Sequence, residues 1–504
     1  MAGGFVAHKS HGTTPDQLIG WVALIVANTC LMVWVAADDG FERLTTLQVV
    51  ATTVLLGALG FWTQPLLEDD HFRYLWDGYV SATTGSPFSH APAYYFGDTT
   101  VPGVMQDALN GINNPTITTI YGPVLQALFG LGYLIAPGQL WPLKLCLLCA
   151  EVAVLILLAQ AGVKPRWMML LVLHPLVIKE SAMTAHPDIL IGVALLAAVL
   201  AWRSSLQMWA AVLAGLAVAM KISTVAILFF FCITREGRFS SKGTLAMLLT
   251  LGLLYTPLLL GESRSEGGGA AIFGEQWVFN PLLFKLGAAV ASDFAARLLS
   301  VGFFALVWLV LLIGWIAKLR LLSLHLPTQN ETSLDTLVWM PVVATFIAML
   351  LLSPVVNPWY WLWVLPLATL HFSAVAWTAA TVSLLAYAHV AVQVMAGSSI
   401  TTYAVPVWAT VLQLLAIGVA LVNSGSCSRW WNHWLGQRRR RLLVGILIAG
   451  MLTVVTAFSA WWWSPSRTQV NLLQDYRYSD VESISTQQLD PYLSLERHDP
   501  IAKK

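Results

Sequence analysis

Residues 68–78 read Glu68-Asp69-Asp70-His71-Phe72-Arg73-Tyr74-Leu75-Trp76-Asp77-Gly78. They come directly after two hydrophobic runs, at about residues 18–37 and 44–62. Charged side chains are costly in a bilayer unless they are paired or functional. The stretch therefore places ionisable chemistry at the edge of a membrane.

The composition indicates a polytopic membrane protein. Hydrophobic residues make up 57% of the chain and charged residues only 11%, with 23 tryptophans. Apolar runs long enough to span a bilayer as helices recur along nearly the whole sequence. We expect an all-α fold with about 11–14 transmembrane helices.

Lysine and arginine in short loops predict the orientation of the C-terminal half. Positive residues favour the cytoplasmic side, and they gather at 235–242, at 318–320 and at 429–441. The segment 261–296, the turn 353–358 and the tail after Trp463 then face outward. The expected location is an inner (plasma) membrane, with the site on its extracytoplasmic side.

Strict alternation of the N-terminal runs would put the Asp70 loop and the His186 region on opposite faces. One run is therefore expected not to cross, and the short run Tyr121–Ala136 and the charged run Trp167–Met183 are the candidates for a re-entrant segment. Lys221 is expected to divide the run 208–234 into two short pieces.

The first constellation of chemical groups lies at the start of the quoted stretch. If Asp70 begins a helix, then Arg73 or Tyr74 and Asp77 follow at spacings of three, four and seven residues and share one face. Carboxylates and a guanidinium would converge there. The alternative is an ordinary helix N-terminus with acids favoured by the helix dipole, although three successive acids exceed what a cap requires.

Three further constellations follow along the chain. Tyr121 lies at the mouth of a hydrophobic run after Asn113, where interfacial anchoring is the alternative. The stretch from His174 to Asp188 holds two histidines, a lysine and two acids, a costly set unless paired or catalytic; a satisfied core histidine is the alternative. The stretch Pro354–Trp361 forms an aromatic rim that by itself is typical of a membrane belt.

Together these motifs, in this order, resemble the polyprenyl-phosphate-sugar-dependent glycosyltransferases of the GT-C superfamily, especially bacterial mannosyltransferase-like members. The resemblance runs from about Pro65 to Pro366 and is carried by 70–78, Gly85-Ser86-Pro87-Phe88, Ile120-Tyr121-Gly122-Pro123, Pro175 to Glu180, His186, Asp188 and Pro358-Trp359-Tyr360. The chain departs from the family at His174, where asparagine is common, and at Phe88, where tyrosine is common.

The resemblance implies a GT-C-like bundle with a large first extracytoplasmic loop. Its expected segments are N-terminal anchor helices (1–63), the loop with the acidic motif (64–118), the transmembrane core (119–366), C-terminal helices (367–463) and a polar tail (464–504). It implies transfer of a hexose, with mannose expected, from a polyprenyl-phosphate sugar to an acceptor glycan or glycolipid, in contact with membrane lipids.

The resemblance also implies that an acid in the first loop is the general base. Asp70 occupies that position, with Asp69 as the alternative. A base of this kind would take the acceptor proton while the lipid phosphate leaves, with inversion. Cations should stabilise the leaving phosphate, and the candidates are Lys179, His186, Lys221 and Arg264. The expected substrate-binding residues are Arg73, Tyr74, Trp76, Asp77, Tyr121, Lys179, Glu180, His186, Asp188, Lys221, Arg264, Trp359 and Tyr360.

No cofactor and no metal are expected, because a lipid-phosphate leaving group does not need the divalent ion that nucleotide diphosphates recruit. A net charge of +1 without a basic domain argues against nucleic acid. The alternative function is a transporter or flippase of a lipid-linked sugar, which predicts internal repeats.

Overall fold

The computed structural model describes residues 15–37, 43–65, 68–260, 269–325, 331–388, 390–393 and 401–424. Contacts divide the chain into two units, 1–448 and 449–504, and all the described residues belong to the first. The predicted span 441–460 and the polar tail lie outside the described residues, and the predicted segment boundaries stay predictions.

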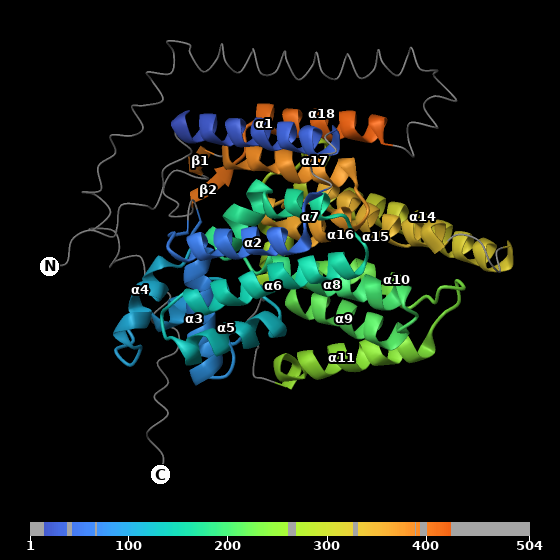
Figure 1. Ribbon diagram of the computed structural model, residues 1–504. Coiled ribbons are helices and arrows are strands. Elements are labelled where there is room, and N and C mark those ends of the chain that lie inside the picture. The colour runs from blue at the N-terminus through green and yellow to red at the C-terminus, as the bar shows by residue number, and fades with distance from the viewer. Residues whose placement is uncertain are drawn as a thin grey trace. The chain divides into compact units, whose positions relative to one another are not determined.

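The regular elements in the described part of the chain are helices, apart from one antiparallel hairpin (Figure 1). The hairpin pairs β1 (Val390–Gln393) with β2 (Thr401–Ala404). The α-helices are α1 (Pro15–Ala37), α2 (Thr46–Phe61), α3 (Asp70–Thr83), α4 (Gly103–Gly111), α5 (Pro123–Ile135), α6 (Trp141–Gln160), α7 (Pro165–Val172), α8 (Asp188–Arg203), α9 (Gln207–Met220), α10 (Leu228–Phe231), α11 (Ser241–Leu260), α12 (Gly269–Gln276), α13 (Phe284–Ala288), α14 (Asp293–His325), α15 (Glu331–Leu352), α16 (Leu365–Leu370), α17 (Ala374–Val382) and α18 (Val407–Asn423).

Shorter helical segments connect these helices. They are the 3-10 turns η2 (Pro92–Tyr95), η4 (Ile222–Ile227), η5 (Pro358–Trp363) and η6 (Ser383–Ala388), and the π-helix η3 (Val177–Met183). Helices α8, α9 and α11 lie side by side, with α9 between the other two (Figure 1).

The predicted break at Lys221 is confirmed, whereas the expectation that one of the runs between 119 and 183 does not cross the membrane stays a prediction. Helix α9 ends at Met220, Lys221 has extended backbone (φ −151°), and a 3-10 turn follows, so Lys221 does divide its run. The charged run 167–183 is broken as well, because α7 ends at Val172 and the chain resumes as a π-helix that is bent by 110° from α8. Irregular backbone of this kind at membrane depth is tolerated where it is enclosed by protein.

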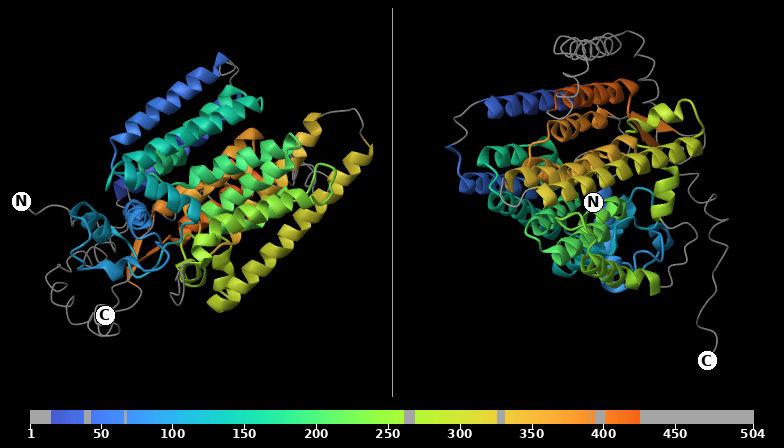
Figure 2. Two further views of the ribbon diagram at one scale, coloured as in Figure 1. Left: turned by 90° about the horizontal axis from the view of Figure 1, so that it is seen from below. Right: turned by 90° about the vertical axis from the view of Figure 1, so that its right-hand side faces the viewer.

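Among the described residues, two helices, α6 and α14, are long and apolar enough to cross a membrane, and the bent pair η3 and α8 would make a third span. Helix α14 lies at one side of the neighbouring helices (Figure 2, left), and only 6% of its most apolar window is buried. A helix this apolar and this exposed requires a nonpolar surrounding. The apolar helices thus indicate a membrane protein, and the 11–14 crossings stay a prediction.

Helix α3 is fixed on two faces by packing. Trp76 and Val80 join a buried cluster with Val101, Met105 and Leu109 at α4. On the other face Gly78 touches α5, where a Cβ atom at this position would lie 2.4 Å from the carbonyl oxygen of Phe129. Only glycine allows so close an approach of two backbones. Packing on both sides therefore holds the acidic start of α3 in a defined place.

Candidate active site

The predicted base lies at the first turn of α3. The helix begins at Asp70, as the predicted spacing requires, and Asp69 is the residue before it. Both carboxylates are part-buried, and the side-chain amide of Asn113 donates to each of them, to Asp70 Oδ1 at 3.2 Å and to Asp69 Oδ1 more closely. A helix N-terminus favours negative charge. One amide thus holds two carboxylates together at a position suited to an anion.

Asp69 is set up to exchange a proton near neutral pH. Its burial and the neighbouring charge of Asp70 raise the pKa of Asp69 from 3.8 to about 6, against the opposing hydrogen bond from Asn113. The pKa values of two carboxylates that share a site commonly move apart in this way, because the charge on one carboxylate disfavours ionisation of the other.

Arg73 holds the loop that carries Asn113. Its guanidinium donates to the carbonyl oxygens of Ile117 and Asn114, each at 3.0 Å, and of Asn113 at 3.4 Å. Asp77, one turn later, accepts a hydrogen bond from the Gln126 amide at 2.9 Å. The five N–H donors of a guanidinium allow this multiple contact. Arg73 therefore acts on the acid pair through the loop 113–117.

A chain of polar groups leads inward from Asp70. The Tyr121 hydroxyl lies 3.4 Å from Asp70 Oδ2 and 3.5 Å from the Tyr74 hydroxyl. The Tyr74 hydroxyl lies 2.8 Å from His186 Nδ1, and His186 Nε2 lies 2.5 Å from Glu68 Oε2. The first and last of these polar groups, Asp70 and Glu68, belong to the acidic stretch. Between them, Tyr121 lies just before α5 and His186 lies just before α8.

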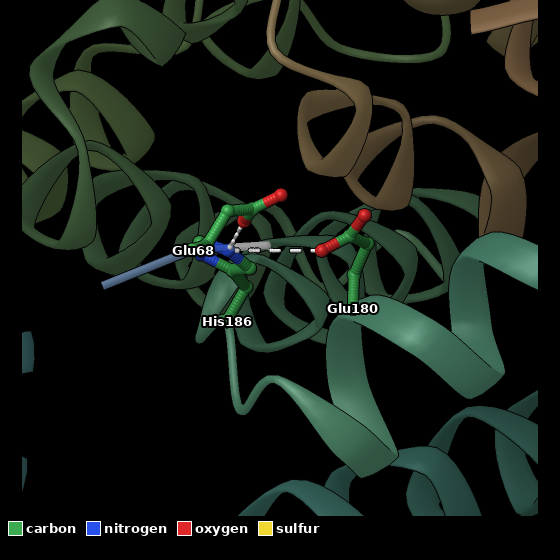
Figure 3. Close-up of side chains that lie close together, drawn as sticks. All are labelled: Glu68, Glu180 and His186. Atoms are coloured by element: carbon green, nitrogen blue, oxygen red, sulfur yellow. Dashed lines mark hydrogen bonds and ion pairs between the residues drawn. The ribbon is translucent and has the colours of Figure 1, made fainter. Parts of the chain in front are cut away.

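His186 is enclosed on every side. Figure 3 shows Glu68 and Glu180 both in contact with one nitrogen of its ring, and the Glu180 carboxylate lies 3.6 Å from this nitrogen, Nε2. The Trp359 ring stacks on the imidazole with centroids 3.9 Å apart and planes 11° from parallel. Both ring nitrogens have protein partners, and His186 is 0% exposed.

Lys179 neutralises the two glutamates beside His186. Its ammonium lies 2.7 Å from Glu68 Oε1 and 3.1 Å from Glu180 Oε2, and it also donates to the Tyr387 hydroxyl at 3.0 Å. Burial alone would raise the pKa of Glu68, but the charge of Lys179 and the hydrogen bond with His186 outweigh burial and lower it to about 2. We call Glu68, Lys179, Glu180 and His186 the ion-pair network.

The ion-pair network also contains the one set of possible metal ligands found among the described residues. Ligand atoms of Glu68, Glu180 and His186 lie within 4.8 Å of one another. The Lys179 ammonium, however, already contacts both carboxylates. A metal ion would have to displace this cation or bind beside it, with strong repulsion at such distances. The donor set therefore fits an ion-pair network better than a metal centre.

A second charged group lies at the break after α9. Lys221 Nζ lies 3.3 Å from Asp188 Oδ1, which also accepts a hydrogen bond from Trp363 Nε1 at 2.6 Å. The ammonium stands over the Tyr360 ring, 4.0 Å from its centroid, in a cation–π contact. We call Asp188, Lys221, Tyr360 and Trp363 the Lys221 cluster.

Irregular backbone positions both groups. The π-helix η3 carries Lys179 and Glu180, and Ala185, directly before His186, has a positive φ of 65°. A non-glycine residue in this region costs about 1–3 kcal/mol and persists only where its surroundings require it. The strained residue, Ala185, lies directly before His186, whose ring contacts Glu68 and Tyr74.

Residues 4–235 match the family model described as alpha-(1->6)-mannopyranosyltransferase, N-terminal domain. The chain is a glycosyltransferase. The match confirms the predicted resemblance to GT-C mannosyltransferases and includes both aspartates, the ion-pair network and Lys221. No curated protein and no solved structure matches the chain significantly.

In this glycosyltransferase, most of the predicted site residues converge. Those brought into the connected groups described above are Asp69, Asp70, Arg73, Tyr74, Asp77, Tyr121, Lys179, Glu180, His186, Asp188, Lys221, Trp359 and Tyr360. Trp76 lies elsewhere, in the apolar cluster between α3 and α4, with 1% of its surface exposed. Arg264 lies outside the described residues.

The residues that contribute to the site but were not predicted include Glu68, Asn113, Trp363 and Tyr387. Glu68 and Asn113 stood in the quoted motifs and could have been included on that ground. Trp363 and Tyr387 lie in apolar sequence without any local signal, and only the three-dimensional fold brings them to the site.

Proposed function

We propose that the chain transfers a mannosyl group from a polyprenyl-phosphate sugar to an acceptor glycan or glycolipid on the extracytoplasmic face of the membrane. The family match supports a mannosyltransferase, and the family's description names an alpha-(1->6) linkage. The observation that carries the proposal is the contact of Asp70, at the start of α3, with Tyr121, at the entrance of α5.

Asp70 is the general base in this proposal. Its carboxylate takes the proton of the acceptor hydroxyl as the hydroxyl oxygen attacks the anomeric carbon. The bond between that carbon and the phosphate oxygen breaks in the same displacement, and the electron pair leaves with the phosphate. A single displacement inverts the anomeric configuration, so an alpha product requires a donor whose sugar is beta-linked.

Lys221 is the cation that stabilises the departing phosphate. Unlike Lys179 and His186, which are held by two glutamates, Lys221 has one carboxylate partner among the residues that the structure describes, Asp188 at 3.3 Å. Asp70 interacts electrostatically with Lys221 and with Tyr360. A fixed cation in surroundings of low dielectric constant stabilises charge that develops on the leaving group.

The acceptor and the lipid set the remaining requirements. The aromatic side chains Trp359 and Tyr360 pack around His186 and Lys221 and give the polar centre an apolar wall. A polyprenyl chain would approach from the membrane along such a wall. Because Lys179 already contacts Glu68 and Glu180, and Lys221 already contacts Asp188, the reaction is proposed to proceed without a metal ion.

The proposal is tested by sugar transfer with purified protein in detergent. The donors are beta- and alpha-linked polyprenyl-phosphate mannose, beta-linked polyprenyl-phosphate glucose and GDP-mannose, each with EDTA and a mannan oligosaccharide as acceptor. We expect transfer from beta-linked polyprenyl-phosphate mannose alone.

Two variants accompany the wild type in this assay. Asp70→Asn should be inactive, while Asp107→Asn, which changes an exposed acid on α4, should retain full activity. Transfer from GDP-mannose, or an Asp70→Asn variant as active as the wild type, would contradict the proposal. A protein that transfers no sugar but moves the lipid across vesicles would support the transporter alternative.

A further inference from the structure

We propose that Tyr121, Tyr74 and His186 form a proton relay that carries the proton taken up by Asp70 to Glu68. The inference rests on the proposed function, since Asp70 must first receive a proton from the acceptor. It gives a purpose to buried polar groups that the displacement itself does not use.

The relay is continuous in space. Its contacts are 3.4 Å from Asp70 to Tyr121, 3.5 Å from Tyr121 to Tyr74, 2.8 Å from Tyr74 to His186 and 2.5 Å from His186 to Glu68. The two contacts of Tyr121 are long, and catalytic hydrogen bonds commonly shorten when substrate binds. Segments more than 100 residues apart along the chain meet to form it, since Tyr74 and His186 are separated by 112 residues.

The relay is shielded from solvent. Tyr74 is 2% exposed, Tyr121 6% and His186 0%. The two phenol rings pack edge to face, with centroids 5.3 Å apart, and the Phe129 ring stacks on Tyr74 at 5.0 Å. Buried hydroxyl groups need hydrogen-bond partners. These rings hold the two hydroxyl groups where each can reach the next.

The hydrogen bonds all run in one direction when His186 is neutral. With its proton on Nε2, His186 donates to Glu68, and Nδ1 accepts from the Tyr74 hydroxyl. The oxygen of Tyr74 can then accept from Tyr121. This arrangement leaves Tyr121 able to accept from a protonated Asp70.

The transfer is balanced in atoms and charge. The Asp70 carboxyl proton moves to the Tyr121 oxygen, the Tyr121 proton moves to the Tyr74 oxygen, and the Tyr74 proton moves to His186 Nδ1. Three O–H bonds break, two O–H bonds and one N–H bond form, and neither tyrosine changes its charge. Asp70 returns to a carboxylate, and His186 becomes an imidazolium.

The surroundings of His186 suit a temporary positive charge. Glu68 faces Nε2 at 2.5 Å and Glu180 faces it at 3.6 Å, while Trp359 stacks on the ring. Lys179, the other cation nearby, is held between the same two glutamates, and Asp70 also contributes its negative charge. Two acids and one lysine thus leave a net negative environment that stabilises the imidazolium.

Glu68 is the exit of the relay. Its side chain is 11% exposed, whereas that of His186 is fully buried. The Nε2 proton of the imidazolium can therefore leave to water by way of Glu68, whose pKa of about 2 means that the carboxylate holds the proton only in transit. An acceptor lying against Asp70 would shield that carboxylate from the solvent. A proton route on the side of Asp70 away from the acceptor would still allow Asp70 to lose its proton and become a base again.

Tyr121→Phe and Tyr74→Phe test the relay, because each removes one oxygen and keeps the ring packing. Tyr79→Phe is the matched control, since Tyr79 lies on the same helix and packs on Tyr133 outside the relay. The measurement is kcat and KM with beta-linked polyprenyl-phosphate mannose at fixed pH, with imidazole or formate added at increasing concentration. The melting temperature of each variant reports on folding.

Each relay variant should lose about tenfold in kcat with little change in KM, because the base is intact but resets slowly. Small bases should restore the lost rate of these variants and leave the wild type and Tyr79→Phe unchanged. Wild-type kcat in both relay variants, or a loss that no small base restores, would overturn the relay. An inactive wild type or an active Asp70→Asn would instead overturn the proposed function, and the relay with it.

Discussion

At the residue scale, the two aspartates before and at the start of α3 share one amide but have different expected roles. Asp70 faces Tyr121 and is the proposed base, whereas Asp69 contacts Asn113 most closely. Removing a general base typically lowers the rate by about 100-fold to 10,000-fold. We expect Asp70→Asn to lose at least about 100-fold in kcat and Asp69→Asn about tenfold, as measured with saturating donor.

The raised pKa of Asp69 predicts the pH dependence of the reaction. A carboxyl group with a pKa of about 6 becomes protonated as the pH falls below 6, and it then ceases to be the anion that Asn113 binds. The wild-type kcat should therefore fall as the pH decreases through 6. In Asp69→Asn that inflection should be missing, and an unchanged inflection would mean that another group titrates there.

Arg73 should matter through the loop that it holds. Arg73→Met removes the guanidinium from three carbonyl groups, of which that of Asn114 keeps a second donor, the Ile117 N–H at 3.1 Å, and it should lower the free energy of unfolding by about 1–3 kcal/mol. Arg297→Met is the control, because Arg297 also donates to two carbonyl groups, and its partners Gly274, Trp277 and Asp293 are not among the predicted site residues. Both variants should have a lower melting temperature, whereas only Arg73→Met should lose transferase activity. Equal activities of the two variants would show that Arg73 does not support the site.

At the element scale, the π-helix η3 depends on the charge of Lys179. Lys179→Met would leave Glu68 and Glu180 side by side without their cation, a loss of about 3 kcal/mol for a broken buried pair. Because the pKa of Glu68 is lowered from 4.5 to about 2, its ion pair stabilises the protein above pH 4.5, and the contribution is lost as the pH falls towards 2. Melting curves of the two proteins should hence differ at pH 7 and converge below pH 4.5.

The contact between α3 and α5 requires glycine at position 78. Gly78→Ala places a methyl group 2.4 Å from the Phe129 carbonyl oxygen, so the helices must separate and Asp70 must move with α3. We expect a lower melting temperature and a lower kcat. Gly103→Ala, at the start of α4, should change neither quantity, because a Cβ atom added there would meet no other atom within 4 Å.

The sequence predicts where the helices and breaks of the site lie better than it predicts which of them come into contact. The start of α3 at Asp70 and the break at Lys221 followed from local spacing and from one charge in an apolar run. The ion-pair network did not follow, because Glu68 and His186 are 118 residues apart and their pairing depends on the bend between η3 and α8. Trp76 is a different case. Its position in the motif predicted a role in substrate binding, and its side chain lies in the packed apolar cluster between α3 and α4.

At the scale of the whole molecule, the orientation in the membrane is the main prediction. The loop with the acidic motif should face outward, and the loop with Arg235 and Arg238 should face the cytoplasm. A cysteine at exposed Thr99 should react with a membrane-impermeant maleimide on intact cells, while a cysteine at exposed Ser241 should react only after permeabilisation. The five native cysteines would first be replaced by serine. The reverse pattern would place the site on the cytoplasmic side.

Single-turnover transfer from beta-linked polyprenyl-phosphate mannose, with EDTA present, by wild type and Asp70→Asn side by side would decide whether Asp70 is the base of an inverting, metal-independent mannosyltransferase. We expect an alpha-linked mannosyl product from the wild type and none from Asp70→Asn, with equal binding of the donor by both. A beta-linked product, a requirement for added metal, or full turnover by Asp70→Asn would contradict this mechanism.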